Sequence, residues 1–366
     1  MKKGKNIIIS MEKKKFNKII NDSRIYYFDY LRIICSFLVI LIHVSSQYYY
    51  RFDINSYEFK IAYYYNGFSR FSVPNFFMIS GALFLNKDLS FKIIFNKYIK
   101  RIIIHILLWS IIYAFININL KELNIKKKFF EIINGPYHLW YLYATIGLYI
   151  LIPFTRRICQ NKDLLKSFIN FNFIILFIIP NYIYIISYYS IEISNILNVI
   201  NSKLNFYILS VNNFYFIFGY YLHMKNAINK EFKITIYILG LISIIFSTKI
   251  SYDFAFIKKK KIIHFSHTFF NIFFTSISIF IFFKNYFNKL KTNNIIDIII
   301  QYISQLTFGI YLIHPLIIQT MKDLNIFYLQ INIIFLIPFI TLFIFILSLI
   351  FIIVLKNIPK IGKLLI

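Results

Sequence analysis

The sequence predicts an all-α, polytopic membrane protein: a helix bundle of about ten transmembrane helices. Two observations support this fold class. Hydrophobic residues make up 59% of the 366 residues and the mean hydropathy is +0.65, as is typical of multi-pass membrane proteins. Apolar runs of about twenty residues, the length a helix needs to cross a hydrocarbon core of ~30 Å, recur along nearly the whole chain.

These runs follow one another with only short polar segments between them. Each is expected to be a helix, because lipid offers no partner for an exposed backbone N–H or C=O group. We expect one membrane domain, 25–356, between a basic amino-terminal segment, 1–24, and a short tail, 357–366. The predicted spans lie at 28–47, 61–85, 102–120, 139–155, 168–190, 204–222, 232–250, 264–283, 295–318 and 331–355.

The distribution of lysine and arginine predicts the orientation. With the amino terminus inside, the inner segments hold about twice as many of these residues as the outer loops, which favours two cytoplasmic termini. The lysines at 258–261 contradict this trend, because they fall in an outer loop. Either that loop handles an anionic ligand, or the number of spans near 232–283 is different.

The overall charge and the cysteines exclude several other classes. The formal charge of +27 comes mainly from lysines between apolar runs, so a nucleic-acid partner is not indicated. Cys35 and Cys159 form no disulfide framework and no metal-binding spacing. The apolar run at 28–47 lacks a small-residue cleavage site and contains charged residues, so it is not a cleaved signal peptide.

Three ionisable residues occupy the first predicted span: Asp29, Arg32 and His43. Eleven residues of α-helix bring a side chain back to within about 20° of its starting direction, about 16 Å further along the axis. All three residues therefore share one stripe, which is expected to face a polar interior. The alternative is an Asp29–Arg32 pair at the inner interface and a histidine that snorkels to the outer one.

Five blocks in the chain resemble, in order, the signatures of the acyltransferase 3 family of bacterial membrane O-acyltransferases. The first, "DYLRIICSFLVILIHVS", has the family's basic residue, ten intervening residues and then a histidine, matched here by Arg32 and His43. The others are "RFSVPNFFMISGALFL" (70–85), "HLWYLYATIGLYILIPF" (138–154), "FYFIFGYYL" (214–222) and "SQLTFGIYLIHPLII" (304–318). The chain is most similar to the branch that has no appended extracellular domain.

The resemblance implies transfer of an acyl group other than aminoacyl: acetyl, or a similar short group such as succinyl. The resemblance further implies that the donor is cytoplasmic acyl-CoA and that the acceptor is a hydroxyl of an envelope or exported polysaccharide or of its lipid-linked precursor. His43 is expected to act as a general base or to carry the acyl group transiently, since an unperturbed imidazole has a pKa of about 6.5. Asp29 is expected to hold Arg32 in place.

Further residues of these blocks are candidates for substrate binding, each with a structural alternative. Arg70 needs a partner in mid-span, and Ser80 could instead serve close helix packing. The others could form an interfacial belt rather than a binding site. The candidates are Arg70, Ser80, His138, Trp140, Tyr311 and His314.

Lys97, Lys100 and Arg101 are the expected binding site for the phosphates of acyl-CoA. The alternative is a set of anchors that follow the positive-inside rule. The family often has two arginines three residues apart here, followed by a proline, whereas this chain has lysines and His105. Lysine binds phosphate as a point charge rather than in a bidentate fork.

The expected partners are acyl-CoA, a carbohydrate acceptor and the lipid bilayer of a bacterial cytoplasmic membrane. No bound cofactor is expected: acetyl-CoA would be a co-substrate, and the histidine spacing does not indicate a metal site. An exporter of polysaccharide or lipid-linked sugar is the alternative function, because it would also need a polar cavity, but no repeated halves support it.

Overall fold

The computed structural model describes residues 24–116, 130, 132–187, 189–203, 209–225, 227–259, 266–287, 294–329, 331–358 and 362. All regular elements within these ranges are helices, which confirms the predicted all-α bundle. Eight helical stretches in this part of the chain are long and apolar enough to cross a membrane. They are Tyr26–Arg51, Phe91–Ile116, Ile132–Gln160, Lys162–Ile186, Lys230–Ile257, Phe270–Phe287, Ile295–Asp323 and Ile333–Asn357.

Single helices form three of these stretches: α2 (Tyr26–Arg51), α15 (Phe270–Phe287) and α17 (Ile333–Asn357). Two more stretches are dominated by α8 (Trp140–Gln160) and α16 (Asn294–Asp323). The other three contain a wider π-helical turn where one helix continues into the next. These are α5–η1–α6 (Phe91–Ile93, Ile94–Ile99, Lys100–Ile116), α9–η3–α10 (Lys162–Phe173, Ile174–Ile178, Ile179–Ile186) and α13–η4–α14 (Lys230–Ile245, Phe246–Ile250, Ser251–Lys258).

Two of the ten predicted spans are not single long helices. The span at 61–85 is divided into α3 (Tyr57–Ser69) and α4 (Ser72–Phe84), with the break at Arg70 and Phe71. Pro74 lies in the first turn of α4, where its missing N–H costs no helical hydrogen bond. The span at 204–222 corresponds to α12 (Val211–Met224), which has 14 residues. A further helix, α11 (Ile191–Lys203), was not predicted.

The predicted outer loop with four consecutive lysines begins later than expected. Helix α14 continues to Lys258, and Lys259 follows it with a left-handed backbone (φ 49°). Residues 260–265, which include the last two lysines, lie outside the described ranges, as do the predicted amino-terminal segment up to residue 23 and most of the tail.

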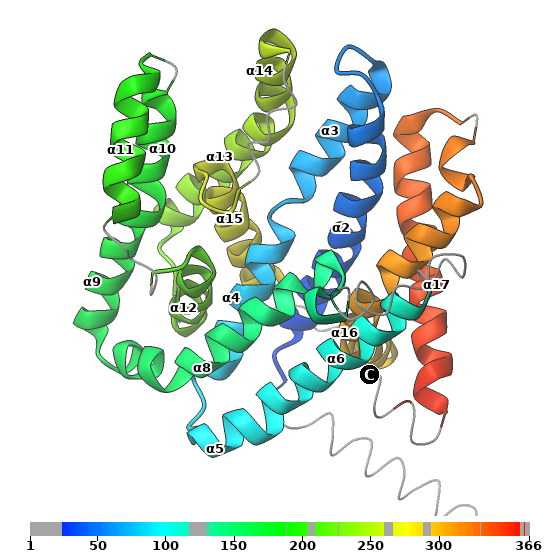
Figure 1. Cartoon of the computed structure of the whole chain (residues 1–366). Coiled ribbons are helices and arrows are strands. Elements are labelled where there is room, and N and C mark those ends of the chain that lie inside the picture. Colours follow the sequence, from blue (N-terminus) through cyan, green and yellow to red (C-terminus); the bar gives the residue numbers. More distant parts are fainter. Residues whose placement is uncertain are drawn as a thin grey trace, which may run out of the picture.

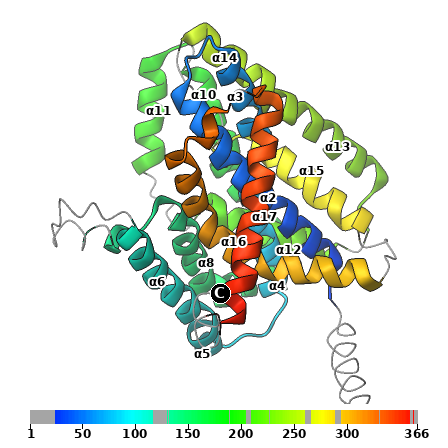
Figure 2. The ribbon, with the colours of Figure 1, turned by 90° about the vertical axis from the view of Figure 1, so that its right-hand side faces the viewer.

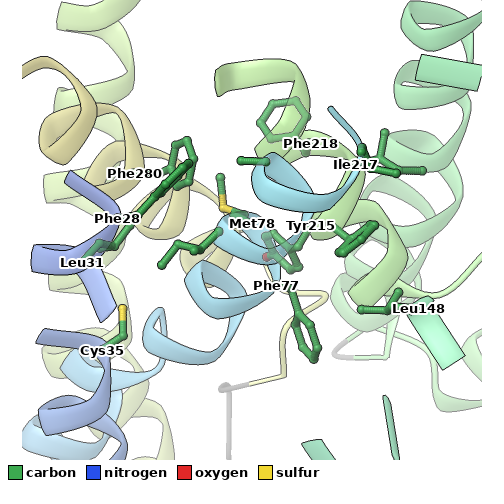
Figure 3. Packing of buried hydrophobic residues seen from close by; sticks show 14 of the residues in the cluster. Phe28, Leu31, Cys35, Phe77, Met78, Leu148, Tyr215, Ile217, Phe218 and Phe280 are labelled. Carbon is green, nitrogen blue, oxygen red and sulfur yellow. The ribbon is translucent and has the colours of Figure 1, made fainter. Parts of the chain in front are cut away.

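Helix α4 lies at the centre of the packing. Figure 3 shows its Phe77 and Met78 between Phe28 and Leu31 of α2 and Tyr215 of α12. Helices α4 and α12 approach each other at two glycines. A Cβ atom on Gly81 would lie 1.6 Å from the carbonyl oxygen of Phe216, and one on Gly219 would lie 2.2 Å from that of Met78. The two backbones are therefore in direct contact, and only hydrogen fits between them.

A buried lysine fixes the end of α12. Lys284 Nζ donates hydrogen bonds to the carbonyl oxygens of Leu222 (2.7 Å), His223 (2.8 Å) and Lys225 (2.6 Å). The last carbonyl groups of a helix have no partner within the helix, and an ammonium group can satisfy three of them at once. This contact connects α15 to α12, and through α12 to α4.

The two ends of the bundle differ. Figure 1 shows the α2–α3 connection and the connection from α16 to α17 at the upper end, and α5 at the lower end. Figure 2 shows α17 at the front, α5 and α6 on one side, and α13 with α15 on the other. The candidate site lies inside this arrangement, along α2 and α16.

Candidate active site

A cavity of about 190 Å³ lies between α2, α4, α8 and α16. Its lining includes six of the side chains singled out from the sequence: Arg32, His43, Ser80, His138, Trp140 and Tyr311. The remaining lining residues are Val39, Val73, Phe76, Ile79, Tyr141, Thr307 and Phe308. The fold thus brings residues from four separate sequence blocks to one cavity, with a few polar groups set in an apolar wall.

Three histidines meet at one part of this site. The ring centres of His43 and His314 are 5.3 Å apart, and those of His138 and His314 are 5.9 Å apart. His43 and His138 line the cavity, whereas His314 contacts both rings and is fully buried. The hydroxyl oxygen of Tyr137 lies 3.4 Å from Nδ1 of His43, so this tyrosine belongs to the same cluster.

Hydrogen bonds orient the ring of His314 and hold the backbone of His138. Nδ1 of His314 lies 3.2 Å from the carbonyl oxygen of Ile310, and because a carbonyl only accepts, this nitrogen donates. Pro315, next in the chain, lies within α16 and has no N–H to donate. The hydroxyl of Tyr311 donates to the carbonyl oxygen of His138 at 2.5 Å, which connects α16 to the start of α8.

The imidazole nitrogens of His138 remain available to a substrate. His138 is only 2% exposed, and neither ring nitrogen has a hydrogen-bond partner among the described residues. Most buried polar groups in proteins are paired, and an exception needs an explanation. Here the ring lines the cavity, where a polar group of a substrate would supply a partner for a ring nitrogen.

At the other end of the cavity, Asp29 holds two arginines. It accepts from Arg24 Nε at 2.7 Å and from Ser304 Oγ at 2.6 Å, while Arg32 Nη1 lies further away, 3.6 Å from Oδ1. Asp29 is 2% exposed, so the positive charges around it offset the cost of burying its carboxylate. The predicted Asp29–Arg32 pair is present, but the shortest ionic contact of Asp29 is with Arg24, which the sequence had placed in the amino-terminal segment.

Arg70 lies outside the cavity lining and is held by an amide. Its Nε and Nη2 donate to Oδ1 of Asn66 at 2.9 and 2.5 Å. Asn66 is 1% exposed, and its Nδ2 donates to three acceptors on α2: the carbonyl oxygen of Ile42, Ser45 Oγ and Ser46 Oγ. Asn66 therefore joins Arg70 to the turn of α2 that carries His43.

This bridge gives a testable prediction. The Asn66→Ala variant should lower the melting temperature of the detergent-solubilised protein by several degrees, because it removes two hydrogen bonds of Arg70 and those that Asn66 donates to α2. Losing a buried hydrogen-bond partner costs about 1–3 kcal/mol, and more for a charged group. The exposed Asn55, whose amide bonds only Asp53 in its own loop, supplies the control Asn55→Ala. Equal melting temperatures for the two variants would contradict this role.

Sequence reasoning missed several polar residues of the site. Tyr141 and Thr307 lie in blocks quoted for the resemblance, but neither was singled out. Asn66 could have been found from its position four residues before Arg70, since side chains at that spacing meet on a helix. Arg24 and Ser304 gave no such signal, because the contact between Ser304 and Asp29 spans 275 residues.

Comparison with known proteins gives one match: the family model of the acyltransferase 3 domain covers residues 25–356, nearly the whole chain. The chain belongs to this acyltransferase family. No curated protein and no solved structure gives a significant match. Membership in the acyltransferase 3 family, together with the eight apolar helices, establishes a multi-pass membrane acyltransferase.

The third group of predicted residues in this acyltransferase lies away from the cavity. Lys97 lies in the π-helical turn η1, and Lys100 and Arg101 begin α6. All three are exposed, and α5, which leads into η1, lies at the end of the bundle opposite the α2–α3 connection (Figure 1). They lie inside the helical stretch Phe91–Ile116. The predicted span at 102–120 had placed them just before its first residue.

A row of aromatic rings leads from this basic group towards the cavity of the acyltransferase. Lys97 Nζ lies 5.6 Å from the ring centre of Tyr98, and Tyr98 and Tyr149 have ring centres 6.3 Å apart. Tyr149 in turn packs against Phe84 of α4, with ring centres 4.6 Å apart, and Phe84 lies one helical turn beyond the cavity-lining Ser80. The basic group and the cavity are thus connected along one side of α8.

Proposed function

We propose that the protein is a membrane O-acyltransferase of the bacterial cytoplasmic membrane. It moves an acetyl or similar short acyl group from cytoplasmic acyl-CoA to a hydroxyl of an envelope or exported polysaccharide, or of its lipid-linked precursor. The observation that carries this proposal is the cavity in which Arg32 and His43 lie on one stripe of α2 and His138 meets them from the short 3-10 turn Tyr137–Leu139, just before α8.

The size of the cavity supports a short acyl group. Pockets that hold a whole drug-sized ligand measure about 300–1,000 Å³. A cavity of about 190 Å³ can take an acyl group and the sulfur end of the CoA arm, but not the nucleotide. The nucleotide phosphates therefore bind outside, at Lys97, Lys100 and Arg101, and the arm follows Tyr98 and Tyr149 to Arg32.

The distance along α2 fits the shape of the donor. Arg32 and His43 are separated by eleven residues, which corresponds to about 16 Å along a helix. The thioester of acyl-CoA lies at the end of a long arm, well away from the phosphates. In our proposal the phosphates stay at the basic group outside, Arg32 donates hydrogen bonds to a carbonyl oxygen of the arm, and the thioester carbonyl reaches His43.

His43 then acts in one of two ways. As a general base, it takes the proton of the acceptor hydroxyl while the oxygen attacks the thioester carbonyl, and the CoA thiolate leaves. As a nucleophile, it displaces CoA to form an acyl-imidazole, which the acceptor hydroxyl then attacks. The uncommitted nitrogens of His138 are placed to hold the acceptor hydroxyl or the developing oxyanion in either route.

The proposal is tested with purified protein, acetyl-CoA and the glycans of a deletion strain. We expect release of free CoA that depends on glycan, and mass spectrometry should find acyl increments on wild-type glycans that the deletion strain lacks. An exporter would release no CoA. Unchanged glycan masses together with absent CoA release would refute the proposal.

The basic group gives a second prediction. The triple variant Lys97→Gln/Lys100→Gln/Arg101→Gln should raise KM for acetyl-CoA about tenfold or more, because charge-assisted hydrogen bonds are worth about 1.5–3 kcal/mol. Its kcat should change little, since these residues lie outside the cavity. The exposed Lys92 on α5 supplies the control Lys92→Gln. An unchanged KM in the triple variant would assign these residues to membrane anchoring alone.

A further inference from the structure

A polar groove lies beyond the histidine cluster, where α2 and α16 end. A hollow of about 520 Å³ adjoins a second one of about 480 Å³, and both are lined by Tyr48, Arg51 and Phe327. The polar lining of the larger hollow is completed by Ser46, Gln47, Tyr50 and Lys322. We define these two hollows as the terminal groove.

Helical spacing aligns the terminal groove with the candidate active site. Arg51 follows His43 by eight residues on α2, and Lys322 follows His314 by eight residues on α16. Residues at this spacing lie on one broad face of a helix, about 80° apart around the axis and about 12 Å apart along it. Since the rings of His43 and His314 are in contact, both cations lie two turns beyond the same histidine pair.

One side chain joins the two regions directly. Gln47 lies between His43 and Arg51 on α2, and its Nε2 is 3.5 Å from the carbonyl oxygen of His43. Tyr50, on the same side of the helix, is 66% exposed and presents an apolar ring next to the charged groups. The polar stripe that starts at Arg32 therefore continues through the histidines to the end of the bundle.

The chemistry of the larger hollow selects a negatively charged ligand. Two cations, an amide and hydroxyl groups line it, and its described lining contains no carboxylate. Glu58 lines the adjoining hollow, and Asp323, next to Lys322, accepts from Gln319. Guanidinium and ammonium groups bind carboxylate or phosphate by charge-assisted hydrogen bonds.

A purely structural role explains part of this arrangement. Arg51 and Lys322 lie in the last turns of their helices, where a positive charge offsets the partial negative charge of the terminal carbonyl groups. That role requires one cation at each helix end. It does not require the two cations to share a hollow that is aligned with the histidines.

We infer that the terminal groove binds an anionic sugar unit of the acceptor, so that the substrate is an acidic saccharide. The inference rests on the proposed function for the identity of the ligand as acceptor. Binding of the charged unit two turns beyond His43 would present the hydroxyl of a neighbouring sugar unit to the cavity. The orientation predicted from the lysine distribution puts this groove on the outer side, where exported glycans are found.

The test is direct binding, measured by calorimetry with the protein in phosphatidylcholine nanodiscs. The probes are tri-galacturonic acid and its carboxyl-reduced counterpart, trigalactose. We expect saturable binding of the acid, at least tenfold weaker binding of trigalactose, and at least tenfold weaker binding of the acid by Arg51→Gln/Lys322→Gln. The matched control is Lys60→Gln, on α3 at the same end, where the ammonium packs over Tyr64.

Several results would overturn the inference. They are equal binding of the two trisaccharides, no saturable binding of the acid, or an unchanged affinity in the double variant. Loss of binding when phosphatidylglycerol is added to the nanodiscs would assign the groove to lipid headgroups instead. The melting temperature of each variant shows whether it is folded.

Binding measured with the His43→Ala variant distinguishes saccharide binding in the terminal groove from the proposed acyl transfer. That variant should bind tri-galacturonic acid like the wild type, because His43 lies outside the groove lining. Binding by wild-type protein without any CoA release would refute acyl transfer but keep the groove as an anionic saccharide site. Release of CoA in the presence of a neutral glycan, without binding of tri-galacturonic acid, would support acyl transfer and refute the groove as an anionic saccharide site.

Discussion

Replacing His43 with alanine should lower acyl transfer by about 10²–10⁴-fold or more, while the protein still folds and inserts into the membrane. Proton transfer by a positioned side chain contributes about this factor, and a lost nucleophile would cost at least as much. His43 is partly exposed to the cavity and contacts the rings of Tyr137 and His314. Its removal should therefore affect chemistry more than packing. The measurement is glycan-dependent CoA release by purified protein.

A second histidine provides the matched control. His223, at the end of α12, lies outside the cavity lining, and its Nδ1 is 2.8 Å from the hydroxyl of Tyr27. His223→Ala loses one hydrogen bond, worth about 1 kcal/mol of stability, and should keep its transfer rate. Comparable rates for His43→Ala and wild type would remove His43 from the mechanism.

The same variant distinguishes the two possible roles of His43. Wild-type protein incubated with radiolabelled acetyl-CoA and no acceptor should retain label after an acid quench if an acyl-imidazole forms, and His43→Ala should not. If His43 is only a general base, neither protein retains label, and added imidazole should partly restore transfer by the variant. Label that persists on His43→Ala would point to a different nucleophile.

The sequence was sufficient to predict the stripe on α2 but not the residues that support it. Arg32 and His43 share a stripe because both belong to one helix with a fixed turn per residue. The partners Arg24 and Ser304 of Asp29, and Asn66 of Arg70, depend on how helices pack, which spacing within one helix does not determine. Prediction succeeded where one helix determines the geometry.

The same distinction explains the errors in the helices. Hydropathy reports whether a segment is apolar, so it predicted one continuous span at 61–85, whereas the structure has two shorter helices there. It did not reveal that the helix breaks at Arg70 and Phe71, because hydropathy averaged over a long window does not report a local break in the backbone. The predicted span at 204–222 is wrong at its start, because α12 begins at Val211, where the side chain of Ser210 accepts a hydrogen bond from the Asn213 N–H. Hydropathy does not report such local backbone features, so it does not determine where these helices begin and end.

The glycine contact between α4 and α12 leads to the largest predicted effect on stability. Gly81→Ala and Gly219→Ala should each prevent recovery of folded protein, or lower its melting temperature far more than an ordinary core substitution. The added methyl group would meet backbone atoms of Phe216 in one case and of Met78 in the other, all within 3.0 Å. A side chain could rotate away, but a backbone carbonyl within a helix cannot move without displacing the helix.

The chain contains a glycine that isolates this effect. Gly147, in the middle of α8, has no atom within 4 Å of the position of a Cβ, so Gly147→Ala changes helix propensity alone and should be neutral or stabilising by up to about 1 kcal/mol. Overpacking of a core typically costs about 1–3 kcal/mol, and a contact between two backbones should lie at or above that range. If Gly81→Ala, Gly219→Ala and Gly147→Ala had the same melting temperature, the close approach of α4 and α12 would be refuted.

The Gly81→Ala substitution also tests whether the rate of acyl transfer depends on the position of α4. Helix α4 contributes Val73, Phe76, Ile79 and Ser80 to the cavity lining, and Ser80 is adjacent to Gly81. Any Gly81→Ala protein that does fold must move α4 away from α12 and hence towards α2, on its other side. That movement narrows the cavity between Ser80 and His43, so the folded fraction should transfer acyl groups more slowly than Gly147→Ala at equal protein concentration. A folded Gly81→Ala protein with an undiminished rate would show that the cavity does not depend on the position of α4.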